Sequence, residues 1–278
     1  MVDGVTAPAR GARPVPAVAP GELWYDDGGS GPGVVLLHGL ADTHELWRRQ
    51  LPVLRRSYRA IAVDHYGHGR SPLPPGRLTT EVMADGVAVL IESLAIAPCV
   101  VVGLSMGGGV AQVLALRHPE LVRGLALVST SSEFPPMTRE RFLDRAERAE
   151  REGMAAVVDA SVPRWYTPEF MAAHPDEIAT RRAAFLANDP VAFAAASRAN
   201  AARGWSDRLG EIRCPVLYVG GDRDPADAPR SAAIFAARLP DVRIHVLEGV
   251  SHLLPVEAPE RFDDLLLAFL EELNERRR

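Results

Sequence analysis

The stretch Gly103-Leu104-Ser105-Met106-Gly107 matches the pattern Gly-x-Ser-x-Gly and joins two segments of different type. The apolar, β-branched residues 99–102 before it predict a buried strand, and residues 108–118 after it predict a helix that ends before Pro119. Strand, sharp turn and helix in this order are the context in which such a serine acts as a nucleophile. Ser105 would lie at the turn apex, near a helix N-terminus whose dipole favours negative charge. Taken alone, the stretch could equally be a glycine-rich turn with a helix-capping serine.

Composition narrows the classes of protein that the chain can belong to. Its 278 residues and 47% hydrophobic content suit one α/β domain with an insertion. The formal net charge is −5 and no basic stripe is visible, which argues against a nucleic-acid-binding protein. Cys99 and Cys214 fall in or beside predicted strands, so we expect buried thiols and not a disulfide framework.

Several kinds of partner are not expected from the sequence. No cysteine–histidine spacing indicates zinc, so we expect neither a metal nor another cofactor. The longest apolar runs are far too short to span a membrane, and no secretory signal is visible. The sequence therefore predicts a soluble, cytoplasmic protein that acts on a small molecule. It leaves the oligomeric state open.

Strands and helices alternate through the first half of the chain. Residues 1–20 are rich in Ala, Pro and Gly and predict a flexible arm. Residues 21–27 could form the first strand of an opening hairpin whose turn is residues 28–31. Buried strands follow at residues 33–37, 58–64, 99–102 and 125–128, with helices at residues 79–94 and 108–118. This alternation predicts an α/β fold with a mostly parallel central sheet and helices on both faces.

The pattern changes after the serines at positions 129–132. No clear strand occurs from about residue 133 to residue 211; three or four helices are predicted there, with Thr138, Thr167 and Asp189 as candidate capping residues. This segment is too long for an ordinary loop. We therefore expect a helical cap formed by residues 133–212, inserted into a core formed by residues 21–132 and 213–278. Strands resume at residues 215–219 and 242–247, and Pro259 opens the last helix.

Three reactive side chains, Ser105, Asp224 and His252, each follow a predicted strand at its carboxyl end. Ligands bind at this edge of open α/β sheets. A serine hydroxyl is a poor nucleophile at neutral pH, so His252 would accept its proton and return it to the leaving group, while Asp224 would fix the imidazole tautomer. The backbone N–H groups of Leu40, after the pair His38-Gly39, and of Met106 would bind the oxyanion.

Each member of this constellation has a structural alternative. Asp224 could be a turn residue before Pro225, and Asp222 competes with it for the third position of the triad. His252 could be a capping or core histidine. Asp64 also ends a predicted strand, but it precedes the serine turn and is expected to brace the loop formed by residues 65–71.

The substrate pocket is expected to include His44, which follows the oxyanion loop, and the aromatic residues Trp165, Tyr166 and Trp205. The aromatic side chains could instead form the core of the helical cap. No pair of arginines that would clamp a carboxylate is evident in the cap. Its available arginines are by default charges on solvated helix faces: Arg139, Arg164, Arg181, Arg182, Arg198 and Arg203.

On these motifs the sequence resembles the α/β-hydrolase superfamily with a helical cap, over about residues 22–273. The matching stretches are His38-Gly39-Leu40, Gly67-His68-Gly69-Arg70-Ser71, residues 103–108, residues 221–225 and Ser251-His252. Residues 164–170 are similar to the cap of 3-oxoadipate enol-lactonases, although Tyr66 stands where those relatives usually have Arg.

The resemblance implies a cofactor-free serine hydrolase that cleaves a carboxylic ester or lactone through an acyl-enzyme on Ser105. Three alternatives use the same scaffold: a carbon–carbon bond hydrolase, a perhydrolase or acyltransferase, and a non-hydrolytic binding protein or cyclase. An aspartate nucleophile is disfavoured because position 105 is Ser.

Overall fold

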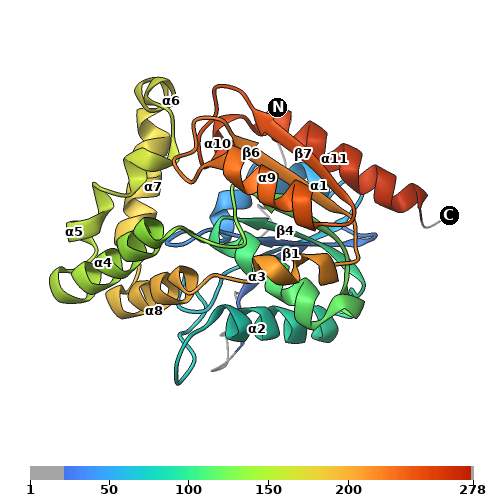
Figure 1. Cartoon of the computed structure of the whole chain (residues 1–278), viewed down its shortest axis with the longest axis horizontal. Coiled ribbons are helices and arrows are strands. Elements are labelled where there is room, and N and C mark those ends of the chain that lie inside the picture. Colours follow the sequence, from blue (N-terminus) through green and yellow to red (C-terminus); the bar gives the residue numbers. More distant parts are fainter. Residues whose placement is uncertain (1–21, 277–278) are drawn as a thin grey trace, which may run out of the picture.

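The computed structural model describes residues 22–276, and a seven-stranded sheet forms its centre (Figure 1). The strand order is β1-β3-β2-β4-β5-β6-β7, and every neighbouring pair is parallel except β1 with β3. The strands are β1 (Tyr25–Gly28), β2 (Gly33–Leu37), β3 (Arg59–Val63), β4 (Cys99–Leu104), β5 (Val122–Val128), β6 (Val216–Gly221) and β7 (Val242–Leu247). The predicted α/β class with a mostly parallel sheet is confirmed.

Helices cover both faces of the sheet, which is why its central strands are continuous apolar runs. Along β2, Val35 and Leu37 face a core shared with α2 (Thr80–Ser93), α3 (Met106–Arg117) and α9 (Ala228–Arg238). Val34 and Leu36 face a second core, shared with the short helices η1 (His44–Trp47), α1 (Gln50–Leu54) and α10 (Leu254–Glu257) and with α11 (Pro259–Glu275). Figure 1 shows α2 and α11 on opposite sides of the sheet.

The predicted opening hairpin is wrong. Strand β1 pairs antiparallel with β3, with Tyr25 opposite Val63, and it does not pair with β2. Both edges of β2 are already occupied, by β3 on one side and β4 on the other. Strand β1 therefore pairs along the outer edge of β3. The predicted flexible arm, residues 1–20, lies outside the described residues.

Helix limits follow the capping residues in most places. The Thr79 hydroxyl accepts a hydrogen bond from the Val82 N–H at 3.2 Å and starts α2 where predicted. A 3-10 turn, η2 (Pro119–Leu121), follows α3.

Among the helices of residues 22–276, none is long and apolar enough to cross a membrane. Cys99 is buried and Cys214 is half-buried, and both thiols are free.

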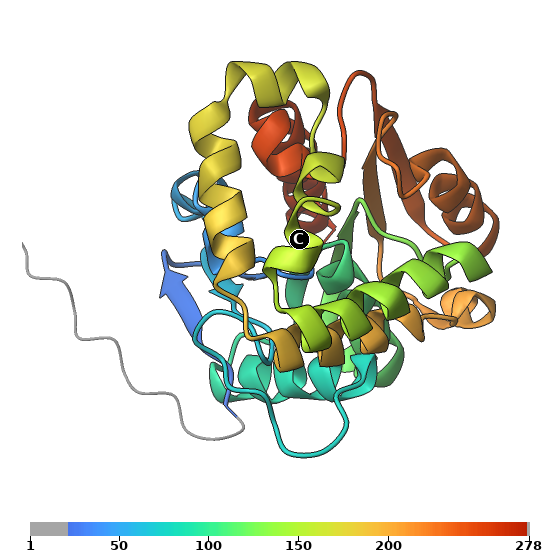
Figure 2. The same cartoon turned by 90° about the vertical axis from the view of Figure 1, so that its left-hand side faces the viewer.

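The chain between β5 and β6 is folded into helices that gather on one side of the sheet (Figures 1 and 2). We call residues 133–212 the helical segment. Thr167 and Asp189 cap two of its helices as predicted, but Thr138 does not cap the first, which begins after Pro135. Its elements are α4 (Pro136–Glu152), α5 (Ala155–Val158), η3 (Val162–Trp165), α6 (Pro168–Ala173), α7 (Pro175–Leu186), α8 (Pro190–Ala201) and η4 (Ser206–Glu211).

The helical segment has a core of its own, which includes Val157, Phe185 and Phe193. Ala41, from the loop after β2, is buried in the same cluster. The chain enters the segment from the carboxyl end of β5, so its helices lie over the edge of the sheet where the loops after the other parallel strands emerge.

Candidate active site

Ser105 connects β4 to α3 in a strained backbone conformation. Its φ of 53° and ψ of −107° lie where residues other than glycine are rare. The turn is held from both sides: the Ser105 N–H donates to the Val128 carbonyl at 2.9 Å, and its own carbonyl accepts from the Thr130 hydroxyl at 2.7 Å. The Ser105 hydroxyl makes no capping hydrogen bond to α3. The alternative of a helix-capping serine is therefore wrong.

The glycines of the turn are required by close backbone approaches. A Cβ at Gly103 would lie 2.4 Å from the Gly107 carbonyl oxygen, and one at Gly107 would lie 2.4 Å from the Leu37 carbonyl oxygen. Cβ atoms do not tolerate such distances, so only glycine lets α3 pack against the end of β2. This packing brings Gly39 beside Ser105, where a Cβ on Gly39 would be 3.5 Å from that of Ser105.

The loop after β2 is held by a buried histidine. The His65 N–H donates to His38 Nε2 at 3.0 Å, so His38 carries its proton on Nδ1, which donates to the Gly39 carbonyl at 2.7 Å. Burial lowers the pKa of His38 although Asp64 acts in the opposite direction, so the ring is neutral. Its hydrogen bond orients the peptide that precedes Leu40.

Two backbone N–H groups border the space next to Ser105. Met106 is the first residue of α3, where an N–H lacks an intrahelical partner, and Leu40 lines the cavity described below. Within residues 22–276, neither N–H donates a hydrogen bond to another group of the chain. Both N–H groups remain available for a ligand oxygen.

Asp224 and His252 come together from the loops after β6 and β7. His252 Nδ1 lies 2.8 Å from Asp224 Oδ2, and the other oxygen of Asp224 accepts the Ala226 N–H at 2.8 Å. The Asp224 side chain is 1% exposed and that of His252 is 13% exposed, so the ring remains accessible from the cavity while its partner is buried. Asp222 instead accepts the Gly249 N–H at 2.7 Å and braces the neighbouring loop.

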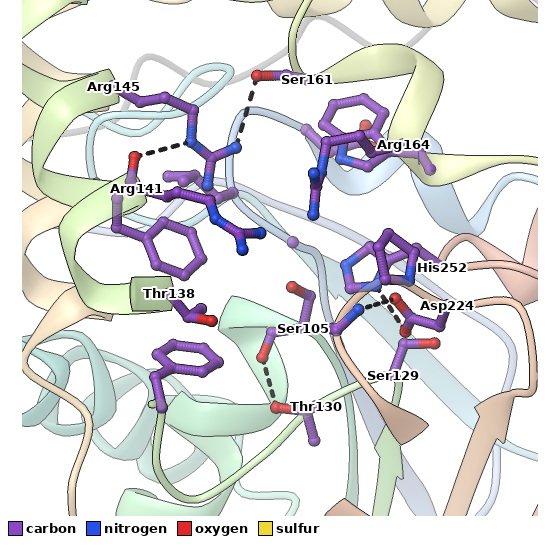
Figure 3. A pocket seen from close by; sticks show the side chains of 18 of the residues that line it. Ser105, Ser129, Thr130, Thr138, Arg141, Arg145, Ser161, Arg164, Asp224 and His252 are labelled. Atoms are coloured by element: carbon purple, nitrogen blue, oxygen red, sulfur yellow. Dashed lines mark hydrogen bonds and ion pairs between the residues drawn. The ribbon is translucent and has the colours of Figure 1, made fainter. Parts of the chain in front are cut away.

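A cavity of about 280 Å³ joins these groups to the helical segment. Ser105, Asp224, His252 and Leu40 line it from the sheet edge, and Figure 3 shows Ser105, His252 and Asp224 at one side of it. Of the four residues expected to form the pocket, Trp165 lines this cavity. The described residues contain no group of three or more side chains placed to hold a metal ion.

His44, Tyr166 and Trp205 do not line the cavity, so their predicted place in the pocket is wrong. His44 Nδ1 lies 2.9 Å from Asp64 Oδ1, and its ring packs on Trp24 at a centroid distance of 4.3 Å. Tyr166 is buried in the core between the sheet and α11. Trp205 Nε1 donates to the Gln112 side chain at 3.0 Å. Each of these rings is therefore held in a structural contact.

The predicted role of Asp64 is confirmed. Its Oδ2 accepts the Arg70 N–H at 3.0 Å, and its Oδ1 accepts the His44 N–H at 2.7 Å. Asp64 thus braces the loop that follows β3. Burial acts to raise the pKa of this carboxyl, but the hydrogen bonds from His44 and the charge of that ring outweigh it and the pKa is lowered.

Two arginines predicted to be solvated are buried. Arg203 lies directly behind the serine turn: its Nη1 donates to the Thr130 hydroxyl at 2.9 Å, and its Nη2 donates to the Ser105 carbonyl at 3.2 Å. Burial alone lowers the pKa of Arg203 to about 9. Arg181, on α7, is buried against Asp42 of the loop after β2. Arg203 thus supports the serine turn, and Arg181 supports the loop after β2.

The sequence prediction missed Arg141, Arg145 and Arg148, which line the cavity from α4. They recur at intervals of four and three residues, a spacing that places side chains on one helix face. Like charges at this spacing destabilise a helix, so the repeat is itself a signal. The arginine repeat is hard to recognise in the sequence because other charged residues surround it on α4.

Comparison with known proteins places this chain among hydrolases. Residues 32–259 match the family model described as alpha/beta hydrolase fold. A solved structure of a malate-bound thermophilic esterase from Thermogutta terrifontis is 32% identical, with a TM-score of 0.85, and the match covers 90% of this chain and 93% of that one. The enol-lactonase from Burkholderia xenovorans LB400 is 30% identical, with a TM-score of 0.86, over 90% of this chain and 96% of that one. A protein named for carbamate hydrolysis, RutD of Pseudomonas syringae pv. syringae, is 30% identical over 86% of this chain and 93% of its own length.

Proposed function

The chain belongs to the α/β-hydrolase fold family and is a hydrolase, and from this premise we propose that it cleaves a carboxylic ester or lactone through an acyl-enzyme on Ser105. The observation that carries the proposal is the His252–Asp224 pair, 2.8 Å apart, in the same cavity as a serine held at a φ of 53°. The names of two similar structures, esterase and enol-lactonase, favour an ester or lactone as the bond that is cleaved.

In the proposed mechanism the Ser105 Oγ attacks the carbonyl carbon while His252 Nε2 accepts its proton. Asp224 accepts a hydrogen bond from His252 Nδ1–H, which keeps Nε2 free to act as the base and stabilises the imidazolium. The carbonyl oxygen becomes negative and is bound by the N–H groups of Leu40 and Met106, each worth about 3 kcal/mol in such sites.

Collapse of the tetrahedral intermediate breaks the bond to the alkoxy oxygen, which takes the proton from His252. A water molecule then attacks the acyl-enzyme and gives its proton to the same nitrogen. The second collapse returns this proton to Ser105 Oγ and releases the carboxylic acid. No redox step or external cofactor enters this sequence.

We further propose that residues 133–212 act as a cap on a core formed by residues 21–132 and 213–278. The cavity supports this division, because the reacting groups come from the loops after β4, β6 and β7 and the opposite wall comes from α4 and η3. Trp165 belongs to that opposite wall, where it would contact the part of the substrate away from the reacting carbonyl.

The proposal is tested by intact mass spectrometry after incubation with a fluorophosphonate probe. The wild type should gain one adduct, and folded Ser105→Ala and His252→Ala should remain unmodified. The matched kinetic comparison is Asp224→Asn against Asp222→Asn, since Asp222 lies in the same loop but only braces Gly249. Ester hydrolysis should fall about 10⁴-fold in the first variant and change by less than about threefold in the second. An adduct on Ser105→Ala, or equal loss in both aspartate variants, contradicts the proposed triad.

A further inference from the structure

The wall of the cavity that faces Ser105 is unusually rich in arginine. Arg141 and Arg145 extend from α4 and Arg164 from η3, and all three line the cavity. Figure 3 shows their guanidinium groups directed into the space that Ser105 and His252 also line. The charged side chains of two separate elements thus converge on one volume.

These three arginines have no acidic partner within residues 22–276, which sets them apart from their neighbours. Arg151, on the same helix α4, pairs with Glu152, and Arg198 on α8 pairs with Glu150 at 2.5 Å. In contrast, Arg145 makes two long hydrogen bonds, from its Nε to the Arg141 carbonyl at 3.4 Å and from its Nη1 to the Ser161 hydroxyl at 3.5 Å, and its guanidinium lies 4.6 Å from the centroid of the Phe142 ring.

The acidic residues that line the cavity do not neutralise this charge. Asp42 is held by Arg181 and Asp224 by His252, so both are already paired. Asp144 of α4 is the remaining acidic residue of the described lining; it is exposed, as are Arg141 and Arg164, and it forms no ion pair with any of the three arginines in the described structure. The cavity wall therefore carries an excess of positive charge.

The accumulated charge affects the arginines themselves. Burial, together with the charges of Arg164 and Arg141, lowers the pKa of Arg145 to about 10, while Asp144 acts in the opposite direction. Placing like charges together in a partly desolvated cavity is unfavourable in the unbound protein. A bound anion relieves this repulsion and can accept bidentate hydrogen bonds from the planar guanidinium groups.

We propose that the substrate is a small ester or lactone that carries a carboxylate at a distance from the reacting carbonyl, and that Arg141, Arg145 and Arg164 bind this carboxylate. This inference rests on the proposed hydrolase function and adds the class of substrate. The cavity volume of about 280 Å³ suits a substrate of this size. The carboxylate fixes the substrate so that its ester carbonyl faces Ser105.

The inference is tested with two esters that differ in charge and by one methyl group. Mono-4-nitrophenyl glutarate carries a free carboxylate, and its methyl ester is neutral. For the wild type, kcat/KM should be at least about tenfold higher with the anionic ester. In Arg145→Gln that preference should fall by about 10- to 100-fold through KM, because charge-assisted hydrogen bonds are lost. Hydrolysis of the neutral ester should change less than about threefold.

Two further variants serve as references. Arg151→Gln removes an exposed charge from the same helix outside the cavity and should leave the preference unchanged. Arg145→Lys retains the charge but not the bidentate geometry and should give an intermediate loss. If the wild type hydrolyses the neutral ester as well as the anionic one, or if Arg151→Gln and Arg145→Gln behave alike, the inference is overturned while the hydrolase proposal stands.

A direct binding measurement separates the two proposals. Calorimetric titration of Ser105→Ala with monomethyl glutarate should give a dissociation constant at least about tenfold lower than titration of Ser105→Ala/Arg145→Gln. If neither nitrophenyl ester is hydrolysed but this difference is found, the hydrolase proposal fails and the carboxylate site stands. If the two titrations give equal affinities or no binding, the carboxylate site is refuted.

Discussion

Replacing Arg181 by Met is expected to lower the free energy of unfolding by about 3–5 kcal/mol, because it leaves a buried carboxylate without its partner. Arg181 Nη1 donates to both oxygens of Asp42, at 2.8 and 3.0 Å, and its Nε donates to Glu177 at 2.9 Å. The side chains of Arg181 and Asp42 are 3% and 4% exposed, so water cannot replace these bonds. Glu177 keeps Arg48 as a partner, and most of the loss therefore falls on Asp42.

The assay is urea unfolding followed by circular dichroism, together with thermal melting. For a chain of this size the expected loss corresponds to a fall in Tm of roughly 6–20 °C. Arg182→Met is the matched control: Arg182 neighbours Arg181 on α7, but its pair with Asp159 is at the surface and should contribute less than about 1 kcal/mol. Adding Asp42→Asn to Arg181→Met should recover part of the loss, because it removes the unpaired charge.

The pH dependence gives a second readout of the same network. Burial acts to raise the pKa of Glu177, but the hydrogen bond and charge of Arg181 and the charge of Arg48 outweigh it, so the pKa is lowered. The resulting stabilisation is present above the ordinary Glu pKa and is lost as the pH falls through the lowered one. The deficit of Arg181→Met should accordingly shrink in acid. A deficit below about 1 kcal/mol at pH 7, or no recovery from Asp42→Asn, would refute the reasoning.

Three further predictions concern the supports of the site. Gly107→Ala places a methyl group 2.4 Å from the Leu37 carbonyl oxygen and should lower ester kcat/KM about 100-fold. Gly210→Ala, whose methyl group would have its nearest neighbour at 3.7 Å, should leave kcat/KM unchanged. Equal activity of the two variants would contradict the requirement for glycine at position 107. Arg203→Lys loses the bonds to Thr130 and Ser131 and should destabilise the protein by about 1–3 kcal/mol in urea unfolding, and an unchanged midpoint would count against this role. Burial lowers the pKa of His68 to about 3. The contribution of this neutral histidine to the free energy of unfolding should be fully present above the unfolded pKa of about 6.5 and should fall by up to about 1.4 kcal/mol per pH unit below it. His68→Gln should reduce this slope in urea unfolding measured as a function of pH.

The strands and the serine turn could be predicted because their constraints are local. A strand buried on both faces is an unbroken apolar run, and the turn at Ser105 needs glycine where backbone atoms approach within 2.4 Å. The position of Asp224 and His252 after their strands followed from the same pattern. The pairing of β1 with β3 could not be predicted, because it depends on which sheet edge is unoccupied and not on residues 25–28 themselves.

The pocket was predicted less well because side-chain direction within the helical segment depends on packing. An aromatic residue such as Tyr166 or Trp205 suits a pocket and a core equally; Tyr166 is buried in one core of the sheet, and Trp205 packs against the other. An arginine can likewise be solvated, buried in an ion pair or directed at a ligand. Arg181 and Arg203 differ from a solvated arginine such as Arg182 only in that other parts of the chain cover them.

The two uses of arginine in the helical segment have different consequences for catalysis. The proposed carboxylate site on α4 contacts the substrate alone, so substitution of Arg145 should change which ester is preferred and leave the rate with a neutral ester intact. Arg181 on α7 reaches Asp42, two residues beyond Leu40, and Asn188, which follows the end of the same helix, donates to the Ala41 carbonyl at 3.2 Å. Loss of Arg181 should therefore displace the Leu40 N–H and lower kcat for charged and neutral esters alike. Substrate preference can thus vary through α4 while the attachment of α7 preserves the proposed oxyanion site.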